Sequence, residues 1–197
     1  MFRKVLIFGI VFLGITALNL PAIAADKYDI DPAHSTLGFA IKHLKVSTVR
    51  GVFTNYSGAI EFDPNDLSSF KTEVTIQANS IDTKNEQRDN HLKSADFFDV
   101  EKFPTITFTN AKLEKQADGV VIVGDLMMKG VTKSITIPVE VSGPVKGMQG
   151  DDVIGIAGEG MINRQDFGIS WSKALDSGGL VVDDTVRLVV EIEAHKK

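Results

Sequence analysis

Apolar and polar residues alternate with a period of two through much of this chain, most clearly in segments 36–42, 73–78, 134–142 and 186–193. Successive side chains of a β-strand point to opposite faces, so this alternation predicts strands with one apolar and one hydrated face. Strands of that kind are typical of antiparallel sheets. The pattern therefore predicts an all-β fold built mainly from antiparallel strands.

Weaker alternation predicts further strands near 27–31, 49–62, 104–114, 119–129 and 153–164. Turn-forming sequences separate several of them, including Asp63-Pro64-Asn65, Asp118-Gly119 and the stretch 147–151. A short helix is expected within 84–94, and 165–184 shows no regular pattern. No linker or repeat divides the sequence, which indicates a single domain of about eight or nine strands.

An antiparallel sheet of this size must protect its edges, and closure into a barrel removes them completely. A barrel of eight strands either fills its interior with its own side chains or holds one small ligand. Glycines inside the predicted strands, such as Gly51 and Gly124, indicate bulges or sharp bends. A solid β-sandwich explains the same pattern, so periodicity alone leaves barrel and sandwich open.

Residues 1–24 have the layout of a secretory signal peptide. Arg3 and Lys4 precede an apolar run over 5–18, and 22–24 supply the small residues of a cleavage site. The run is short for a membrane span of about 20 residues. We therefore expect a periplasmic or secreted protein, cleaved after residue 24, with no stable membrane anchor.

Removal of residues 1–24 leaves a domain of 173 residues, 25–197, which is long enough for one full hydrophobic core. The formal net charge of the whole chain is −5, and loss of Arg3 and Lys4 makes it −7. This acidic balance argues against a nucleic-acid partner. The sequence contains no cysteine, so disulfides and a thiol nucleophile are excluded.

Residues 80–103, SIDTKNEQRDNHLKSADFFDVEKF, make an unusually long connection between two predicted strands. The connection combines many charged residues with Phe97, Phe98 and Phe103. Long connections of this composition are usually lids or binding loops. Ion pairs can fix its polar half while the phenylalanines need burial, which predicts a mouth over an apolar cavity.

Charged residues inside this connection have two interpretations. Arg88, His91 and Lys93, together with Glu86 and Asp89, are expected to form an ion-pair network that fixes the loop. Alternatively, Arg88, His91 and Lys93 meet the polar head group of a ligand, because such cations bind phosphate and carbonyl oxygens.

A second polar cluster lies at Asn163, Arg164, Asp166 and Trp171, where we expect an Arg164–Asp166 pair to tie a strand end. Its role is expected to be structural.

The four histidines show no spacing typical of a metal site, because neither HxH nor HExxH occurs. His34 follows Asp31-Pro32 and is expected to hydrogen-bond a turn. The sequence GISWS at 168–172 lacks the final glycine of a GxSxG nucleophile elbow. We therefore expect no metal, no cofactor and no catalytic residue.

Several long segments of the chain resemble, in order, the sequence signatures of the YceI-like family of secreted bacterial proteins. They are YDIDPAHS (28–35), HLKVSTVRGVF (43–53), SIDTKNEQRDNHLKSADFFDVEKFPTITF (80–108), KGVTKSITIP (129–138) and INRQDFGISWSKALDSGGLVVDDTV (162–186). The resemblance implies a lipocalin-like antiparallel β-barrel with a long apolar cavity. It also implies binding of polyisoprenoids, such as prenyl lipids or isoprenoid quinones, or of fatty-acid amides.

The apolar residues of the chain are compatible with such a cavity. The candidates for its lining are Phe39, Ile41, Phe53, Ile76, Phe97, Phe98, Phe108, Met127 (with Met128 as the alternative), Phe167 and Trp171. Ordinary core packing is the other interpretation of each of them. Each buried CH₂ contributes about 0.8 kcal/mol, whereas association costs roughly 4–15 kcal/mol, so a ligand of about 15 or more carbons is favoured.

The sequence thus predicts a non-enzymatic protein that binds a long-chain isoprenoid or acyl lipid for transport, storage or stress protection. Two alternatives from other classes stay open. One is an enzyme acting on an isoprenoid or acyl amide, with His91 or His34 as the base. The other is a solid β-sandwich that binds partner proteins. A homodimer is a further expectation about its assembly.

Overall fold

The computed structural model describes residues 25–173 and 180–197, so the expected signal peptide at 1–24 lies outside the described residues. The strands are β1 (Asp26–Ile30), β2 (Thr36–His43), β3 (Ser47–Phe53), β4 (Tyr56–Asp63), β5 (Asp66–Gln77), β6 (Ile81–Asp82), β7 (Thr105–Gln116), β8 (Gly119–Met128), β9 (Val131–Lys146), β10 (Asp152–Asn163) and β11 (Val182–Lys196). The helical segments are α1 (Glu86–Lys93) and two short 3₁₀ turns, η1 (Ala78–Ser80) and η2 (Arg164–Phe167).

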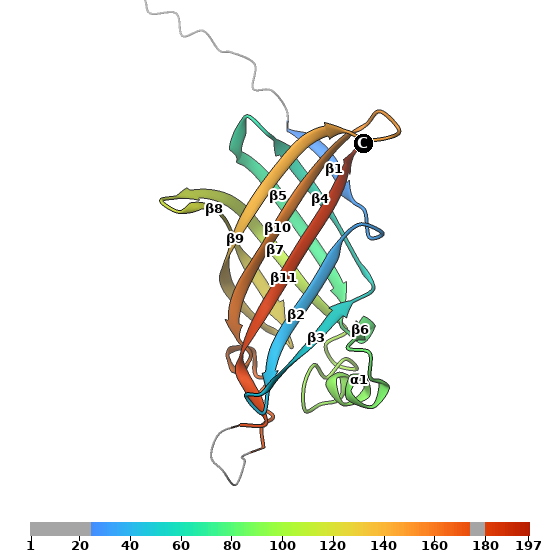
Figure 1. The fold of residues 1–197 in the computed structure, drawn as a ribbon, viewed down its shortest axis with the longest axis vertical. Coiled ribbons are helices and arrows are strands. Elements are labelled where there is room, and N and C mark those ends of the chain that lie inside the picture. The colour runs from blue at the N-terminus through green and yellow to red at the C-terminus, as the bar shows by residue number, and fades with distance from the viewer. Residues whose placement is uncertain (1–24, 174–179) are drawn as a thin grey trace, which may run out of the picture.

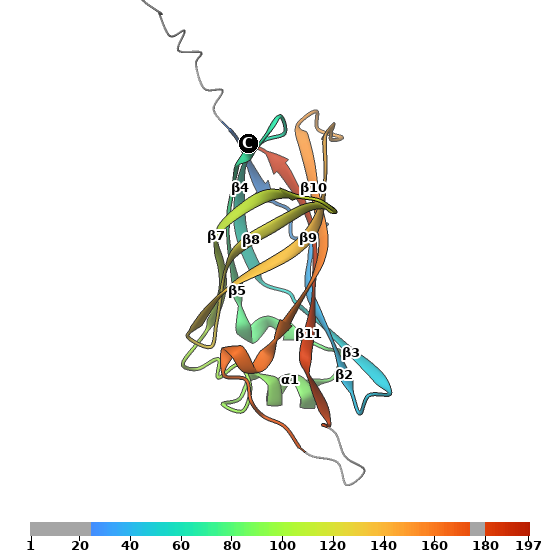
Figure 2. The same cartoon turned by 90° about the vertical axis from the view of Figure 1, so that its left-hand side faces the viewer.

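Eight strands close into an antiparallel barrel (Figures 1 and 2). They follow one another in the order β1-β4-β5-β7-β8-β9-β10-β11, and a pairing between β1 and β11 closes the ring. The long, tilted strands give the barrel its tall shape in both views. The closed barrel with one short helix confirms the fold predicted from the sequence, and the solid-sandwich alternative is wrong.

One edge of β11 is shared by two strands. β1 pairs with β11 from Tyr28↔Lys196 to Ile30↔Ala194, and β2 pairs with it from Thr36↔Glu191 to His43↔Val182. The loop between β1 and β2 therefore connects two strands that pair with successive stretches of β11, and it does not cross the barrel. Beyond β2, the strands β3 and β6 extend the wall toward α1 (Figure 1).

The single strand expected over 49–62 is two strands, β3 and β4, which separate at Thr54 and Asn55. The Thr54 amide donates to the Ser80 carbonyl over 3.2 Å, and the Gln77 amide donates to the Asn55 carbonyl over 2.9 Å. β3 pairs with β2 and β6, whereas β4 pairs with β1 and β5. Periodicity missed the break because apolar residues continue on both sides of it.

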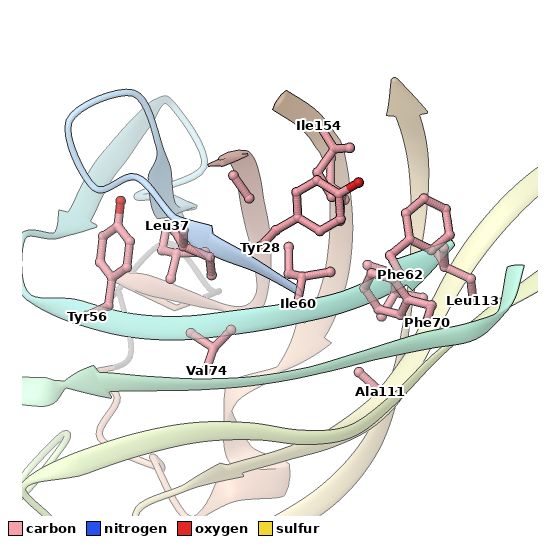
Figure 3. Packing of buried hydrophobic residues seen from close by; sticks show 14 residues of the cluster. Tyr28, Leu37, Tyr56, Ile60, Phe62, Phe70, Val74, Ala111, Leu113 and Ile154 are labelled. Carbon is pink, nitrogen blue, oxygen red and sulfur yellow. The ribbon is translucent and has the colours of Figure 1, made fainter. Parts of the chain in front are cut away.

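A packed cluster of large side chains fills the end of the barrel away from α1 (Figure 3). Tyr28, Phe70, Ile60 and Ile154 are among its largest fully buried side chains. The rings of Phe62 and Phe70 meet edge to face with centroids 5.8 Å apart. We call this cluster the plug, because it closes one end of the barrel. The other end is left for a ligand.

The segment after β6 holds α1 against the opposite end of the barrel (Figures 1 and 2). The Asn85 side chain caps the helix by accepting a hydrogen bond from the Arg88 amide over 2.9 Å. This confirms the short helix expected within 84–94. None of the helices in the part of the chain that the structure covers has the length and apolar character needed to cross a membrane.

Candidate functional site

A cavity of about 370 Å³ lies inside the barrel, between the plug and α1. Its wall is almost entirely apolar and combines inward-facing residues of nearly every barrel strand, including Ile60, Ile76, Ile106, Phe108, Ile122, Leu126, Ile135, Ile137, Ile156 and Leu188. The exposed or half-exposed polar residues on the lining, Lys42, His43, Arg88 and His91, come from the α1 end. That end is therefore the mouth.

The structure brings most of the predicted cavity residues together. Those on the lining are Phe39, Ile41, Phe53, Ile76, Phe97, Phe98, Phe108 and Trp171, together with Arg88 and His91. Sequence reasoning missed most of the aliphatic wall because it selected aromatic residues. The signal was present, since every second residue of the predicted strands was apolar and all of them on one face point inward.

Three predicted site residues lie elsewhere. On β8 the inward positions are Ile122, Leu126 and Met128, so Met128 lines the cavity and Met127, one residue out of phase, does not. Phe167, the last residue of η2, is 1% exposed and packs in the core instead of on the cavity wall. Lys93, at the end of α1, is also absent from the lining.

An aromatic cluster covers the mouth. The His91 ring meets Phe97 edge to face at 5.0 Å between centroids and Trp171 at 5.1 Å. Phe97 and Trp171 are themselves 5.3 Å apart. His91 Nε2 lies 2.9 Å from a carboxylate oxygen of Asp96, which fixes the orientation of the ring. The cluster joins the long loop to the segment that follows η2.

A second aromatic contact continues from the loop into the wall. Phe98 meets Phe53 edge to face at 5.9 Å, and Phe53 lies 6.3 Å from Phe39. Phe97 and Phe98 thus cover the apolar interior as the sequence predicted for this connection, and both belong to the cavity lining.

The charged part of the loop is organised around Thr83, which is 4% exposed. The Thr83 hydroxyl donates to Asp89 over 2.5 Å and accepts from Arg88 Nε over 2.7 Å. Arg88 Nη2 also donates to the Thr83 carbonyl over 2.8 Å. The expected ion-pair network is therefore built differently, because Arg88 and Asp89 are bridged by a threonine and His91 pairs with Asp96. Arg88 still reaches the cavity lining.

Arg164 is the most thoroughly bonded polar residue near the cavity and is 3% exposed. It donates to the carbonyls of Asp183 (2.9 Å), Ile169 (2.7 Å), Trp171 (2.7 Å) and Val182 (3.5 Å), and to the carboxylate of Asp184 (2.8 Å). The predicted ion pair between Arg164 and Asp166 is wrong. The 3₁₀ turn η2 directs the Arg164 side chain toward the start of β11 instead. The structural role of Arg164 is to hold Trp171 and β11 together at the mouth.

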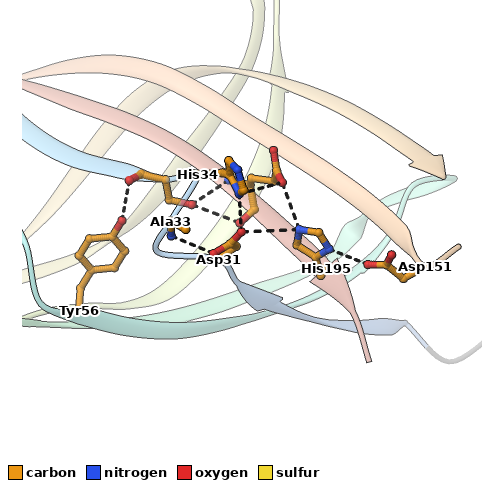
Figure 4. Close-up of polar contacts among 8 residues, drawn as sticks. Asp31, Ala33, His34, Tyr56, Asp151 and His195 are labelled. Atoms are coloured by element: carbon orange, nitrogen blue, oxygen red, sulfur yellow. Dashed lines mark hydrogen bonds and ion pairs between the residues drawn. The ribbon is translucent and has the colours of Figure 1, made fainter. Parts of the chain in front are cut away.

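A polar cluster outside the cavity anchors the loop between β1 and β2 to β11 (Figure 4). His34 Nδ1 lies 2.6 Å from Asp31, and His195 Nδ1 lies 2.6 Å from Asp151. Glu193 accepts contacts from both histidines, at 3.7 Å from His34 and 3.1 Å from His195. The sequence predicted that His34 hydrogen-bonds a turn, and the hydrogen bond between His34 and Asp31 confirms this.

These contacts shift the pKa values of the paired groups. The hydrogen bond with Asp31 raises the pKa of His34, and the same contact lowers the pKa of Asp31. The hydrogen bond with Asp151 raises the pKa of His195 and lowers that of Asp151. Asp31, His34 and Glu193 each place one potential metal-ligand atom within 4.8 Å of the others, as a cation site requires. These atoms are already engaged with one another, because His34 contacts both carboxylates.

A closed antiparallel barrel with an apolar interior is an architecture suited to holding one apolar ligand. Residues 28–194 match the YceI-like domain family, and the chain belongs to the YceI-like family. The UPF0312 protein SAS2572 of Staphylococcus aureus is 43% identical over 168 residues, covering 85% of this chain and 96% of that protein. These findings confirm the family expected from the sequence.

Solved structures show the same fold. The YceI protein of Campylobacter jejuni is 38% identical, with a TM-score of 0.67, covering 79% of this chain and 90% of that one. A polyisoprenoid-binding domain from Saccharophagus degradans is 17% identical, with a TM-score of 0.65, covering 86% of this chain and 98% of that one. At that identity the second likeness concerns the fold alone.

Proposed function

We propose that this protein binds one long-chain apolar lipid, a polyisoprenoid or a fatty-acid amide, inside its barrel and carries or stores it outside the cytoplasm. The observation that supports the proposal most strongly is the cavity of about 370 Å³ with its almost entirely apolar wall. Small-molecule sites commonly range over about 300–1,000 Å³ and are mostly apolar. The likeness in fold to a polyisoprenoid-binding domain supports the same ligand class.

The distribution of polar groups favours a ligand with a long tail and a polar end. The tail would lie among the isoleucines and phenylalanines of the wall, where each buried CH₂ contributes about 0.8 kcal/mol. The polar end would lie at the mouth, near Arg88 and His91. Two nitrogens of Arg88, Nε and Nη2, donate hydrogen bonds to Thr83. The third nitrogen, Nη1, is suited to bind a phosphate or carbonyl oxygen of the ligand.

Binding is favoured over catalysis by the chemistry of the lining. The hydroxyl side chain on the described lining is Thr72, and it donates to the Ala59 carbonyl over 2.8 Å instead of facing a histidine. His91 is oriented by Asp96 but stands among aromatic rings, with no described nucleophile among its contacts. Covalent catalysis needs a nucleophile within hydrogen-bond reach of its base, and none of the described contacts of His91 supplies one.

The test is a titration with a prenyl alcohol and with a long fatty amide, in which isothermal titration calorimetry measures the affinity. Ile135 on β9 lines the cavity, whereas its neighbour Thr136 points outward and is exposed. We expect Ile135→Trp to fill the cavity and weaken binding at least about tenfold, and Thr136→Trp to leave it unchanged. Equal affinity in both variants would place the ligand outside the barrel and refute the proposal.

A further inference from the structure

The turn between β2 and β3, Leu44-Lys45-Val46, lies at the mouth end of the barrel (Figure 1) and carries two exposed apolar side chains. Val46 is 82% exposed and Leu44 is 37% exposed. The residues at the base of the turn, His43 and Val49, line the cavity. The Leu44 amide donates to the Val181 carbonyl over 2.9 Å, which fixes the turn beside the mouth.

The residues of this turn are not those that its backbone conformation favours. Leu44 and Lys45 have φ of 54° and 59°, and the Val46 amide donates to the His43 carbonyl over 3.1 Å, so the turn has both central residues in the left-handed region. Asn and Gly are the residues that such a turn favours, because a larger side chain there is strained. A leucine in this left-handed conformation is unusual, which points to a role for its apolar side chain beyond forming the turn.

The charge of the same hairpin also differs from that of the rest of the chain. Its strands and turn carry the exposed cations Lys42, Lys45 and Arg50, and the sequence has no acidic residue between Asp31 and Glu61. None of the three cations lies within 4.0 Å of a described carboxylate. The formal net charge of the whole chain is −5, so this concentration of positive charge is local.

We propose that the β2–β3 turn docks the mouth of the barrel onto an anionic lipid bilayer. Leu44 and Val46 enter the interface between head groups and acyl chains, while Lys42, Lys45 and Arg50 face lipid phosphates. Apolar side chains flanked by cations are the combination that holds soluble proteins at anionic membrane surfaces. The inference rests on the proposed function, because docking at the mouth gives a lipid a path between bilayer and cavity that avoids water.

The hairpin between β9 and β10 offers a matched comparison. Its Met148 is fully exposed, so it is equally apolar and accessible, but the β9–β10 hairpin itself lies at the plugged end of the barrel (Figure 1). Two acids, Asp151 and Asp152, follow it, and the Lys146 ammonium is paired with Asp152 over 2.7 Å. A general tendency of exposed apolar residues to bind vesicles would involve both hairpins, whereas a docking surface would involve the β2–β3 turn alone.

The experiment is co-sedimentation of the chain beginning at Ala25, which contains the whole barrel, with phosphatidylglycerol vesicles and with phosphatidylcholine vesicles. We expect binding to the anionic vesicles that decreases with added salt. The double variant Leu44→Asn, Val46→Thr keeps residues suited to the turn, and we expect it to bind at least about tenfold more weakly. Met148→Gln should bind as the unaltered chain does.

Cargo content, measured by native mass spectrometry on the same samples, separates this proposal from the one on which it rests. Unchanged cargo with lost vesicle binding in the double variant supports the docking surface. Unchanged cargo with unchanged vesicle binding, or an equal loss in Met148→Gln, overturns it and leaves the proposed function standing. Absence of lipid cargo in every variant would overturn the proposed function, and with it the route from the bilayer.

Discussion

The ring of Phe39 lies directly over Gly51, its register partner on the neighbouring strand. A Cβ atom at position 51 would lie 2.6 Å from two ring carbons of Phe39 and 2.8 Å from the methyl group of Thr83. Phe39 lines the cavity and Thr83 carries the hydrogen bonds of Arg88 and Asp89. Gly51 therefore lies at a contact between the cavity wall and the covering loop, in addition to the one between Phe53 and Phe98.

Replacement of Gly51 by alanine tests this contact. We predict that Gly51→Ala lowers the free energy of unfolding by about 1–3 kcal/mol, because the added methyl group overpacks the site. Urea unfolding measures the change. In a Phe39→Leu background the same substitution should cost less, since the ring is gone and the two sites are coupled. An equal cost in both backgrounds would show that the Phe39 ring is not what excludes a side chain at position 51.

Removal of the Arg164 side chain should have a larger effect. We predict that Arg164→Met lowers the free energy of unfolding by about 3–5 kcal/mol, because it leaves the Asp184 carboxylate and several carbonyls without their donor. Asp184→Asn should cost only about 1 kcal/mol, since the carbonyl contacts of Arg164 remain. Urea denaturation of both variants gives the ranking, and the reverse ranking would contradict the role assigned to Arg164.

Thr83 allows the hydroxyl and methyl contributions to be separated. Thr83→Val removes the hydroxyl that bridges Arg88 and Asp89 but keeps the methyl group over Gly51. We predict faster amide hydrogen exchange over α1, equivalent to a loss of about 1–3 kcal/mol of local stability. Thr83→Ser keeps the hydroxyl and serves as the control. Slow exchange in Thr83→Val would mean that the aromatic contacts alone hold the loop.

The polar cluster around His34 and His195 makes stability depend on pH. The pKa values of both histidines are raised above their ordinary value of 6.5, so their stabilisation is fully present below 6.5 and is lost as pH rises through the raised values. The pKa values of Asp31 and Asp151 are lowered from 3.8, so their stabilisation is present above 3.8 and is lost as pH falls through the lowered values. The cluster therefore stabilises most between these limits.

The measurement is the melting temperature as a function of pH. We predict that the melting temperature decreases as the pH rises above 6.5, through the raised pKa values of the two histidines, and that this decrease is smaller in the double variant His34→Gln, His195→Gln, because that variant has lost the titrating groups. Glu193 faces both histidines and stays in place in the variant. Identical pH profiles for the two proteins would place the dependence elsewhere in the molecule.

The repeating part of the fold could be predicted from the sequence because strand periodicity is local. Alternation around Phe39, Ile76 and Ile135 placed these residues on one face, and all three line the cavity. The break at Thr54 escaped detection because its cause, pairing with Ser80 and Gln77, depends on contacts between distant parts of the chain. The resemblance to the YceI-like family supplied the closure that periodicity left open.

Residues of the candidate site could be predicted where the alternation of a strand sets the direction of the side chain. They could not be predicted where the conformation of a turn sets it. The sequence predicts Met127 wrongly, with Met128 as the alternative, because two adjacent methionines look alike until the strand phase is known. Arg164 was paired with Asp166 because they are neighbours in sequence, whereas η2 directs the guanidinium to Asp184, twenty positions away. His195 lies far from His34 in the sequence, and only the pairing of β1 with β11 brings it to the loop that holds His34.

The central claim is that the barrel holds a single long-chain lipid. Its most direct test is native mass spectrometry of the protein purified without detergent, followed by solvent extraction and identification of any bound lipid. The account predicts one prenyl or acyl lipid per chain in the unaltered protein and in Thr136→Trp, and a much smaller amount in Ile135→Trp. Bare protein that also fails to take up added prenyl alcohol or fatty amide would contradict it.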